Sequence, residues 1–231
     1  VVNCAGMWAR QFGELAGVSL PLQAAEHYYL ITEDMPGMTP TTPVLEDPDR
    51  YAYFREEVGG MMIGLFEPEA APWNLDRIPD DFSFGEIDPD WERMIPFLES
   101  AYERVPEAKN LGIRKFFCGP ESFTPDLAPL VGEAPELRNY FVACGMNSLG
   151  ILSGGGIGRI LAHWIVNGQP DVDVTGINVN RFHGCQANQH YLGDRLVEVL
   201  GKMYEPHYPN LGMTTARNVK RSVLHERLEL A

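Results

Sequence analysis

The sequence predicts a mixed α/β fold that joins a strand–turn–helix unit to a separate antiparallel β-sheet. The first observation is a short apolar run rich in β-formers at residues 140–144, followed by a turn with six glycines between residues 145 and 158. The second is an amphipathic helical pattern over residues 157–165. The third is a series of β-rich segments within residues 26–66, separated by proline and glycine breakers. These patterns indicate two lobes rather than one uniform sheet.

The glycine-rich turn has two interpretations. Backbone N–H groups at a helix start, reinforced by the helix dipole, attract an anion or a partly negative oxygen, and glycine lets a flat ligand approach closely. Alternatively, the glycines only allow the helix to pack closely on the sheet. The spacing Gly154-x-Gly156-x-Gly158 lacks the G-x-G-x-x-G interval of the dinucleotide fingerprint. From the residues alone we therefore predict a glycine-rich backbone segment large enough to bind a cofactor, and the identity of that cofactor stays open.

The first part of the chain reads as a strand end, a Cys-Ala-Gly turn and a short helix within residues 1–17. The apolar side of this helix is predicted to consist of Met7, Trp8, Phe12, Leu15 and Ala16. Residues 26–32 form a β-rich segment, and residues 51–66 are typical of a hairpin around Gly59 and Gly60. We expect these strands to form the antiparallel sheet of the second lobe.

Helices and a long connection are predicted in the rest of the chain. Residues 69–86 are rich in proline and aspartate and indicate a surface loop. Asp90 is suited to cap a helix that ends near residue 105, and Pro96 predicts either a late start or a kink. Residues 187–204 also have a helical pattern.

Composition excludes several classes of protein. A formal net charge of −14 without a basic stripe argues against nucleic acids and anionic membranes as partners. No apolar run approaches the length of a membrane span, and no signal peptide is visible. The four cysteines form no C-x-x-C pair, and we expect Cys4, Cys118 and Cys144 to be small buried hydrophobes in a reducing compartment. The histidines lack the spacing of metal ligands, so no metal site is predicted.

Several motifs resemble the amine-oxidising flavoproteins of the D-amino-acid oxidase class. They are CGPESFTPD, VGEAPELRNYFVACGMNSLGILSGGGIGRILAHWI, the opening VVNCAGMWA, and HYYLIT, so the resemblance covers most of residues 1–185. Within the class, the sequence most resembles sarcosine and dimethylglycine dehydrogenases. A non-enzymatic relative, the regulatory subunit of pyruvate dehydrogenase phosphatase, is similar over the same residues.

The resemblance implies a glutathione-reductase-type flavoprotein fold, with a Rossmann-like FAD-binding part and an antiparallel β lobe that binds substrate. It implies that residues 1–18 and 119–170 belong to the FAD-binding domain and residues 19–118 to the substrate lobe. Residues 171–231 would form a helical connector toward a folate-binding region that is absent. The family's phosphate-binding glycine motif would precede Val1, so we expect the C-terminal part of a larger flavoprotein domain, inactive in isolation.

His27 and Tyr53 are the candidate catalytic residues. From the sequence alone, His27 could equally be a hydrogen-bonded structural histidine and Tyr53 a half-buried strand aromatic. The resemblance changes this interpretation, because His27 matches an H-x-Y-x-x-T pattern and Tyr53 a Y-x-R pattern that Arg55 completes. In the resembling enzymes this pair lies beside the flavin, positions the amino acid and tunes the protonation of its amine.

The resemblance also implies a set of residues that contact the flavin. They are Ala5, Gly6, Trp8, Gly145, Met146, Asn147, Ser148, Leu149, Gly150 and Ile151. The helix start within this set would stabilise negative charge on the flavin. Asp126, in the T-P-D segment, is expected to bond nearby backbone rather than to act as a base. No lysine matches the substrate-carboxylate lysine of other superfamily members, so carboxylate recognition stays unassigned.

These implications describe an FAD-dependent enzyme that oxidises the N-methyl group of sarcosine or dimethylglycine by hydride transfer to flavin N5. Tetrahydrofolate is a possible second cofactor of the full-length parent, and electron-transfer flavoprotein a possible electron acceptor. We expect a soluble protein, in the mitochondrial matrix of a eukaryote or the cytoplasm of a bacterium. The alternative is a regulatory protein on the same fold, and the shared motifs do not separate the two.

Overall fold

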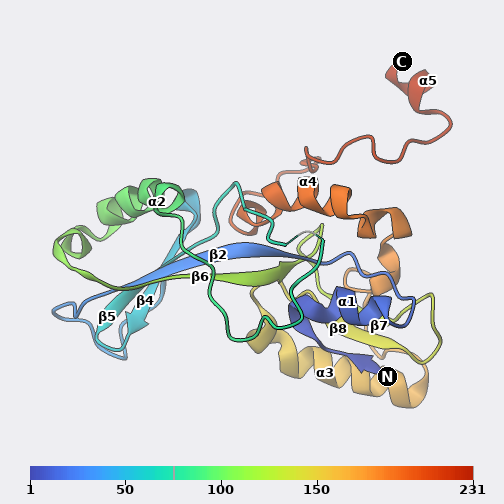
Figure 1. Ribbon diagram of the computed structural model, residues 1–231, viewed down its shortest axis with the longest axis horizontal. Coiled ribbons are helices and arrows are strands. Elements are labelled where there is room, and N and C mark those ends of the chain that lie inside the picture. Colours follow the sequence, from blue (N-terminus) through green and yellow to red (C-terminus); the bar gives the residue numbers. More distant parts are fainter. Residues whose placement is uncertain (75, 231) are drawn as a thin grey trace.

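The computed structural model describes residues 1–74 and 76–230 and contains two sheets (Figure 1). A three-stranded sheet has the order β1-β8-β7, and a five-stranded sheet has the order β3-β4-β5-β2-β6. The strands are β1 (Val2–Asn3), β2 (Gln23–Thr32), β3 (Leu45–Asp47), β4 (Ala52–Glu57), β5 (Gly60–Leu65), β6 (Ile113–Phe123), β7 (Leu130–Glu133) and β8 (Phe141–Cys144). The helices are α1 (Ala9–Glu14), α2 (Trp91–Arg104), α3 (Gly150–Asn167), α4 (Gln189–Val199) and α5 (His225–Glu229). The predicted mixed α/β fold with an antiparallel lobe is confirmed.

The three-stranded sheet carries the predicted strand–turn–helix unit. Strand β8 pairs in parallel with β1 and antiparallel with β7, and helix α3 follows β8 along the chain. Ile157, Leu161 and Trp164 of the helix pack against the sheet. The close approach is at Gly132 of β7, where a Cβ would lie 2.6 Å from the Trp164 ring. At helix glycines 154, 155, 156 and 158 a Cβ would meet nothing within 4 Å, so these glycines do not serve packing on the sheet.

The five-stranded sheet is antiparallel throughout, and its long strands β2 and β6 run toward the three-stranded sheet (Figure 1). Side chains alternate between its faces. Tyr28 and Leu30 of β2 point to the face that α2 covers, where they join one apolar core with Met94, Leu98 and Ala101 of the helix. The neighbours of Tyr28 along β2, His27 and Tyr29, therefore point to the opposite face.

Helix α2 begins at Trp91, directly after its predicted cap. The Asp90 side chain accepts a hydrogen bond from the Arg93 N–H at 3.2 Å. Pro96 lies inside the helix, so the alternative of a late start is wrong. Its ring removes one helical hydrogen-bond donor, a defect that the buried face of the helix compensates.

The predicted apolar side of the first helix is wrong. Phe12 and Leu15 are exposed, whereas α1 buries Arg10 and Gln11. These polar side chains are satisfied by distant partners, since Arg10 donates to the Gln23 side chain at 2.7 Å and Gln11 exchanges two hydrogen bonds with the Ile78 backbone. Burial of polar groups is tolerated because each of these contacts replaces a bond to water.

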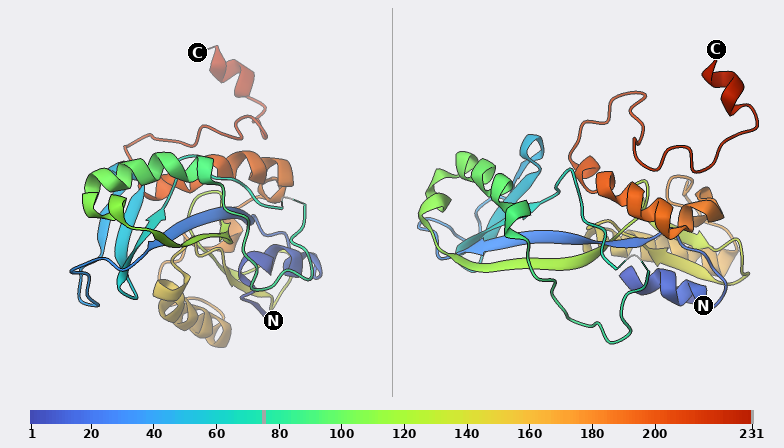
Figure 2. Two further views of the ribbon diagram at one scale, coloured as in Figure 1. Left: turned by 60° about the vertical axis from the view of Figure 1, so that its left-hand side comes forward. Right: turned by 45° about the horizontal axis from the view of Figure 1, so that its top comes forward.

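Helix α4 lies against the five-stranded sheet, whereas the last residues of the chain, with α5, project away from it (Figure 2). Leu192 and Leu196 of α4 share an apolar cluster with Phe66 and Phe123. The helix ends at Val199, and the rest of the predicted helical segment contains a short 3-10 turn, Gly201–Met203. Other 3-10 turns span Gly6–Trp8, Pro48–Arg50, Pro106–Asn110, Val179–Arg181 and Gly184–Ala187.

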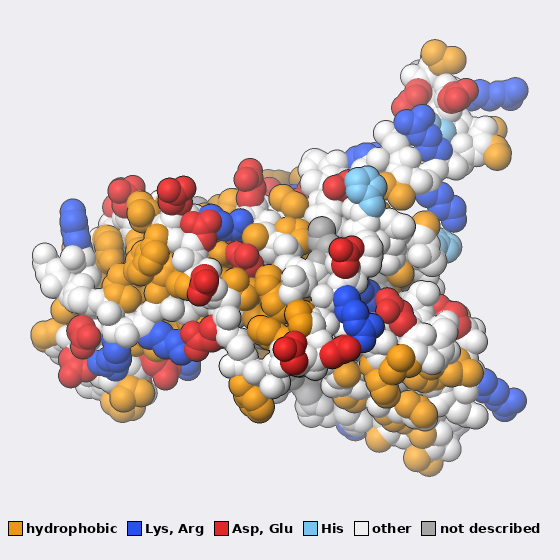
Figure 3. Space-filling model, in the orientation of Figure 1, with side chains coloured by type: hydrophobic (Ala, Val, Ile, Leu, Met, Phe, Trp, Pro, Cys, Tyr) orange, Lys and Arg blue, Asp and Glu red, His pale blue; other side chains and the backbone are white. Residues whose placement is uncertain are grey.

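The predicted loop at residues 69–86 contains no helix or named strand among its described residues. Two of the three cysteines expected inside, Cys118 and Cys144, are buried, but Cys4 is exposed, so that part of the prediction is wrong. No described helix is long and apolar enough to cross a membrane. On the face drawn in Figure 3, basic side chains lie among acidic ones and form no continuous stripe.

Candidate active site

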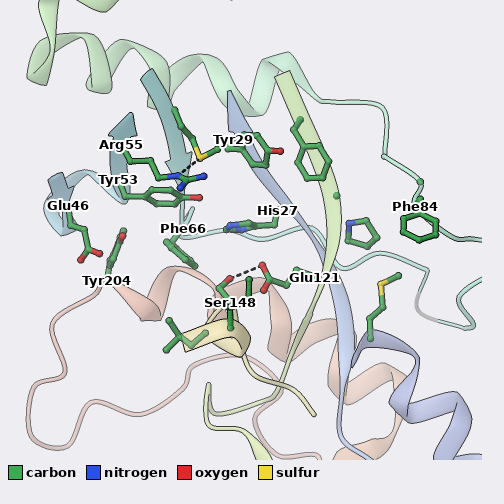
Figure 4. A pocket seen from close by; sticks show the side chains of 18 of the residues that line it. His27, Tyr29, Glu46, Tyr53, Arg55, Phe66, Phe84, Glu121, Ser148 and Tyr204 are labelled. Atoms are coloured by element: carbon green, nitrogen blue, oxygen red, sulfur yellow. Dashed lines mark hydrogen bonds between the residues drawn. The ribbon is translucent and has the colours of Figure 1, made fainter. Parts of the chain in front are cut away.

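A cavity of about 840 Å³ lies on the face of the five-stranded sheet opposite α2 (Figure 4). One wall is the sheet itself, and the rest of the lining comes from the turn before α1, the start of α3, residues 82–85 and Tyr204. The lining residues are Met7, Trp8, His27, Tyr29, Glu46, Tyr53, Arg55, Met62, Phe66, Phe82, Phe84, Gly85, Phe117, Gly119, Pro120, Glu121, Ser148, Leu149, Ile151 and Tyr204. The two predicted catalytic residues therefore share one cavity with part of the predicted flavin-contacting set.

Two glycines let aromatic rings lie across the sheet wall. Tyr53 pairs with Gly64 across β4 and β5, and a Cβ on Gly64 would lie 1.9 Å from Cζ of the tyrosine ring. A Cβ on Gly119 would lie 2.6 Å from the ring of Phe117, which stacks on Tyr29 at 4.6 Å between ring centroids. Because neither glycine has a side chain, both rings can occupy the space above the strands.

His27 is held as a neutral imidazole. Its ring contacts Phe66 at 5.0 Å between centroids, and its buried Nδ1 has no hydrogen-bond partner. Burial lowers the pKa of His27, and the negative charge of Glu121 opposes this shift in part. The imidazole therefore has an unpaired Nδ1 that is closed off from solvent, unlike the fully hydrogen-bonded structural histidine that the sequence left open.

Tyr53 is held as a neutral phenol. Burial is the main cause that raises its pKa to about 12, and Glu121 adds to the rise while Arg55 opposes it. The phenol lies beside Arg55 in Figure 4, with its hydroxyl on the side of His27. It can donate a hydrogen bond to a ligand at neutral pH.

The turn before α3 has an unusual backbone. Asn147 and Ser148 both have positive φ, at 48° and 67°. The buried Asn147 side chain holds this shape, because it accepts from the Thr124 N–H at 2.9 Å and donates to the Gly145 carbonyl at 2.6 Å. No side chain caps the helix that follows, so the first N–H groups of α3 are available to a ligand beside the cavity.

The T-P-D segment has the structural role that the sequence predicts. Asp126 accepts from the Ala128 N–H at 3.1 Å and pairs with Arg181 through two contacts of 2.8 Å. Arg181 also donates to the carbonyls of Pro129, Asn178 and Ala128. This network joins the end of β6 to the segment before α4 and lies outside the cavity lining.

The structure brings some of the predicted site residues to the cavity and leaves others outside its lining. His27, Tyr53, Trp8, Ser148, Leu149 and Ile151 line the cavity, whereas Ala5, Gly6, Gly145, Met146, Asn147 and Gly150 do not. Within the second group, Gly145 and Asn147 shape the turn that presents Ser148. Gly6 has a positive φ of 56° in the turn that leads to Trp8.

Four charged or polar residues of the lining, Glu46, Arg55, Glu121 and Tyr204, had no predicted role. Arg55 is the cation among the described lining residues, and it donates to Glu57 at 2.6 Å and to the Met62 sulfur at 3.3 Å. Glu121 accepts from the Ser148 hydroxyl at 2.7 Å. Strand residues two apart point to the same face of a sheet. The sequence could therefore have placed Arg55 on the face of Tyr53, and Glu121 on the face of Gly119. Tyr204 is brought in by the packing of α4, which no local signal indicates.

A neutral imidazole, a phenol and an uncapped helix start thus meet at one cavity. A family model described as FAD dependent oxidoreductase matches residues 1–164. A second one, FAD dependent oxidoreductase central domain, matches residues 167–222. The chain belongs to the FAD-dependent oxidoreductase family.

Individual relatives agree with this assignment. The chain is 43% identical to 4-methylaminobutanoate oxidase (formaldehyde-forming) of Paenarthrobacter nicotinovorans, over 99% of the chain and 28% of that protein. It is 42% identical to human mitochondrial sarcosine dehydrogenase, over 99% of the chain and 25% of that protein. It is 36% identical to the mitochondrial pyruvate dehydrogenase phosphatase regulatory subunit of Mus musculus, over 99% of the chain and 26% of that protein. The chain thus spans about a quarter of the length of these relatives, and the resemblance found in its motifs is confirmed.

Solved structures show the same fold. The L-proline dehydrogenase of P. horikoshii has a TM-score of 0.64 at 23% identity and covers 79% of this chain and 46% of its own. The glycine oxidase of Geobacillus kaustophilus has a TM-score of 0.62 at 22% identity and covers 79% of this chain and 45% of its own. At these identities the likeness concerns the fold alone.

Proposed function

We propose that this chain belongs to an enzyme that oxidises the N-methyl group of a small amino acid, sarcosine or dimethylglycine. The five-stranded sheet forms the substrate wall of the cavity, and the turn before α1 and the start of α3 form part of the wall that contacts the flavin (the flavin wall). The observation that carries the proposal is the convergence of His27, Tyr53 and the uncapped start of α3 on one cavity. The relatives named for sarcosine dehydrogenase and 4-methylaminobutanoate oxidase support this class of substrate.

The described residues fit the isoalloxazine end of FAD. Bound there, FAD supplies the acceptor for a hydride from the methyl carbon. The first N–H groups of α3 have no side-chain cap, and the positive φ of Asn147 and Ser148 turns the chain into the helix at this point. Such donors and the helix dipole stabilise negative charge next to them. Trp8 would flank the same ligand from the turn before α1.

The chain's own task is to bind the amine and set its protonation. Hydride leaves the methyl carbon only when the nitrogen lone pair is free, so the amine must lose its proton first. The neutral imidazole of His27 lines the cavity and can accept a hydrogen bond or a proton, and the Tyr53 phenol can donate a hydrogen bond to orient the substrate. Arg55 is the residue that we assign to the substrate carboxylate, since it is the cation of the described lining.

Several finer parts of the proposal rest on the family resemblance. We keep residues 1–18 and 119–170 as FAD-binding domain, residues 19–118 as substrate lobe and residues 171–231 as connector. We also keep tetrahydrofolate as a second cofactor, electron-transfer flavoprotein as the electron acceptor, and a mitochondrial or bacterial cytoplasmic location.

A regulatory role on the same fold is the second candidate. The 36% identity to the phosphatase regulatory subunit, over almost the whole chain, favours it. Flavin turnover separates the two candidates, because a regulatory protein needs no reducible flavin beside His27.

The experiment is steady-state turnover of the flavin-loaded full-length parent of this chain with sarcosine, measured as formaldehyde release. We expect His27→Ala to lower kcat/KM by about 100-fold or more, the usual range for a positioned acid–base group. Tyr53→Phe should lower it by about tenfold. The control is His190→Ala, whose side chain is 85% exposed on α4 and should leave turnover unchanged. Unchanged turnover in both site variants would refute the assignment.

A further inference from the structure

The cavity contains an acidic group that the proposed function does not yet use. Glu121 of β6 lines the cavity, and the Ser148 hydroxyl donates a hydrogen bond to its Oε2 at 2.7 Å. None of the ion pairs among the described residues involves Glu121. A carboxylate that faces a cavity without a cation is suited to bind a cationic ligand.

The position of Glu121 relates it to both candidate catalytic residues. On β6 it lies two residues beyond Gly119, which pairs with His27, so Glu121 and His27 share one face of the sheet. Figure 4 shows Glu121 beside His27 and Ser148, on the side of His27 away from Arg55. The negative charge of Glu121 contributes to the pKa shifts of both His27 and Tyr53, which places it within electrostatic reach of the two.

A second acid, Glu46, also lines the cavity but is placed differently. It lies on the edge strand β3, opposite Tyr53, and Figure 4 shows it next to Tyr204. No hydrogen bond holds its carboxylate among the described contacts, whereas that of Glu121 is oriented by Ser148. Ser148 belongs to the turn that starts α3, so Glu121 is fixed at the junction of the sheet wall and the flavin wall.

We propose that Glu121 binds the protonated amine of the substrate and that Ser148 positions its carboxylate for this role. Arg55 lies beyond His27 from Glu121, so a zwitterionic amino acid can place its amine at Glu121 and its carboxylate at Arg55 in one orientation. The amine is thereby held next to His27 and the start of α3, and uncharged isosteres lose this anchor. This inference rests on the proposed function and adds the group that selects a cationic nitrogen.

The test measures binding rather than turnover, by the change in flavin absorbance of the loaded protein. Two ligands are compared under anaerobic conditions that keep the flavin oxidised. Trimethylglycine carries a fixed positive nitrogen. (Methylthio)acetate, CH3–S–CH2–COO⁻, has a neutral sulfur in place of the nitrogen of sarcosine. Glu121→Gln should weaken trimethylglycine by about 10- to 100-fold, as expected for a hydrogen-bonded or close charge contact. Its affinity for (methylthio)acetate should change by less than about twofold.

Three further variants complete the design. Arg55→Met should weaken both ligands alike, because both carry a carboxylate. Glu46→Gln, the matched acid of the same cavity, should leave both affinities unchanged. Ser148→Ala should weaken trimethylglycine selectively but by a smaller factor than Glu121→Gln, since the carboxylate remains.

The outcomes are distinct. Equal loss of both ligands in Glu121→Gln, or no loss of either, would overturn the role of Glu121 while leaving the proposed function intact. If neither ligand perturbs the flavin of the unaltered protein while other amines reduce that flavin, the class of substrate in the proposed function is wrong, and this inference is overturned with it.

Discussion

Gly64→Ala tests whether the position of Tyr53 matters. Gly64 lies in a regular strand without a positive φ, so its backbone accepts alanine. The new Cβ would lie 1.9 Å from Tyr53 Cζ and 2.2 Å from its hydroxyl oxygen. Ordinary contact begins at 3.4 Å, so the ring must retreat by about 1.5 Å from the cavity wall. A displacement of about 1 Å at a reacting centre can slow a reaction by about 100-fold.

Because Tyr53 acts through its hydroxyl, we expect Gly64→Ala to lower the rate of flavin reduction by sarcosine by about tenfold, the factor expected for Tyr53→Phe, measured anaerobically by stopped-flow absorbance. The free energy of unfolding should fall by only about 1–3 kcal/mol, the usual effect of overpacking. Gly154→Ala is the matched control, since its Cβ meets nothing within 4 Å on α3. It should leave the rate unchanged and raise stability by about 0.5–1 kcal/mol. A rate within twofold of the unaltered protein in Gly64→Ala would refute the reasoning.

Three other changes test the fold. Arg181→Met removes the paired partner of Asp126 and leaves three backbone carbonyls without their donor, so the free energy of unfolding in urea should fall by about 2–4 kcal/mol. Glu67 is buried beside Arg93, and burial raises its pKa to about 7, above the value of an exposed carboxyl. Because the folded protein holds this proton more tightly than the unfolded chain, the free energy of unfolding falls as pH rises from about 4.5 to 7. Glu67→Gln should remove that fall, measured as the pH profile of the melting temperature. An unchanged profile in the variant would contradict this. Pro96→Ala restores a helical donor inside α2 and should raise stability by about 1–2 kcal/mol in the same urea assay, where a loss of stability would count against the reasoning.

Elements with strong local periodicity were predictable from sequence. The strand that ends at Cys144 and the helix that ends at Asn167 follow from an apolar β-rich run and a 3.6-residue pattern. The hairpin around Gly60 follows from its breakers. Because strand residues two apart share a face, Tyr53 and Arg55 could be placed together before the structure was known.

Long-range pairing explains what the sequence did not predict. The face of α1 was misread because Arg10 and Gln11 look like surface residues until Gln23 and Ile78 are seen to bond them. Tyr204 reaches the cavity only because α4 packs beside Phe66. Such partners are brought together by tertiary structure, and the spacing of residues along the chain does not predict these contacts.

The most direct test of the central claim is anaerobic flavin absorbance of the purified full-length parent of this chain during titration with sarcosine and then dimethylglycine. The account predicts that one or both bleach the oxidised flavin band, and that His27→Ala slows the bleaching. A bound flavin that neither amino acid reduces would contradict the proposed substrates. A purified protein that binds no flavin would contradict the enzyme itself and favour the regulatory role.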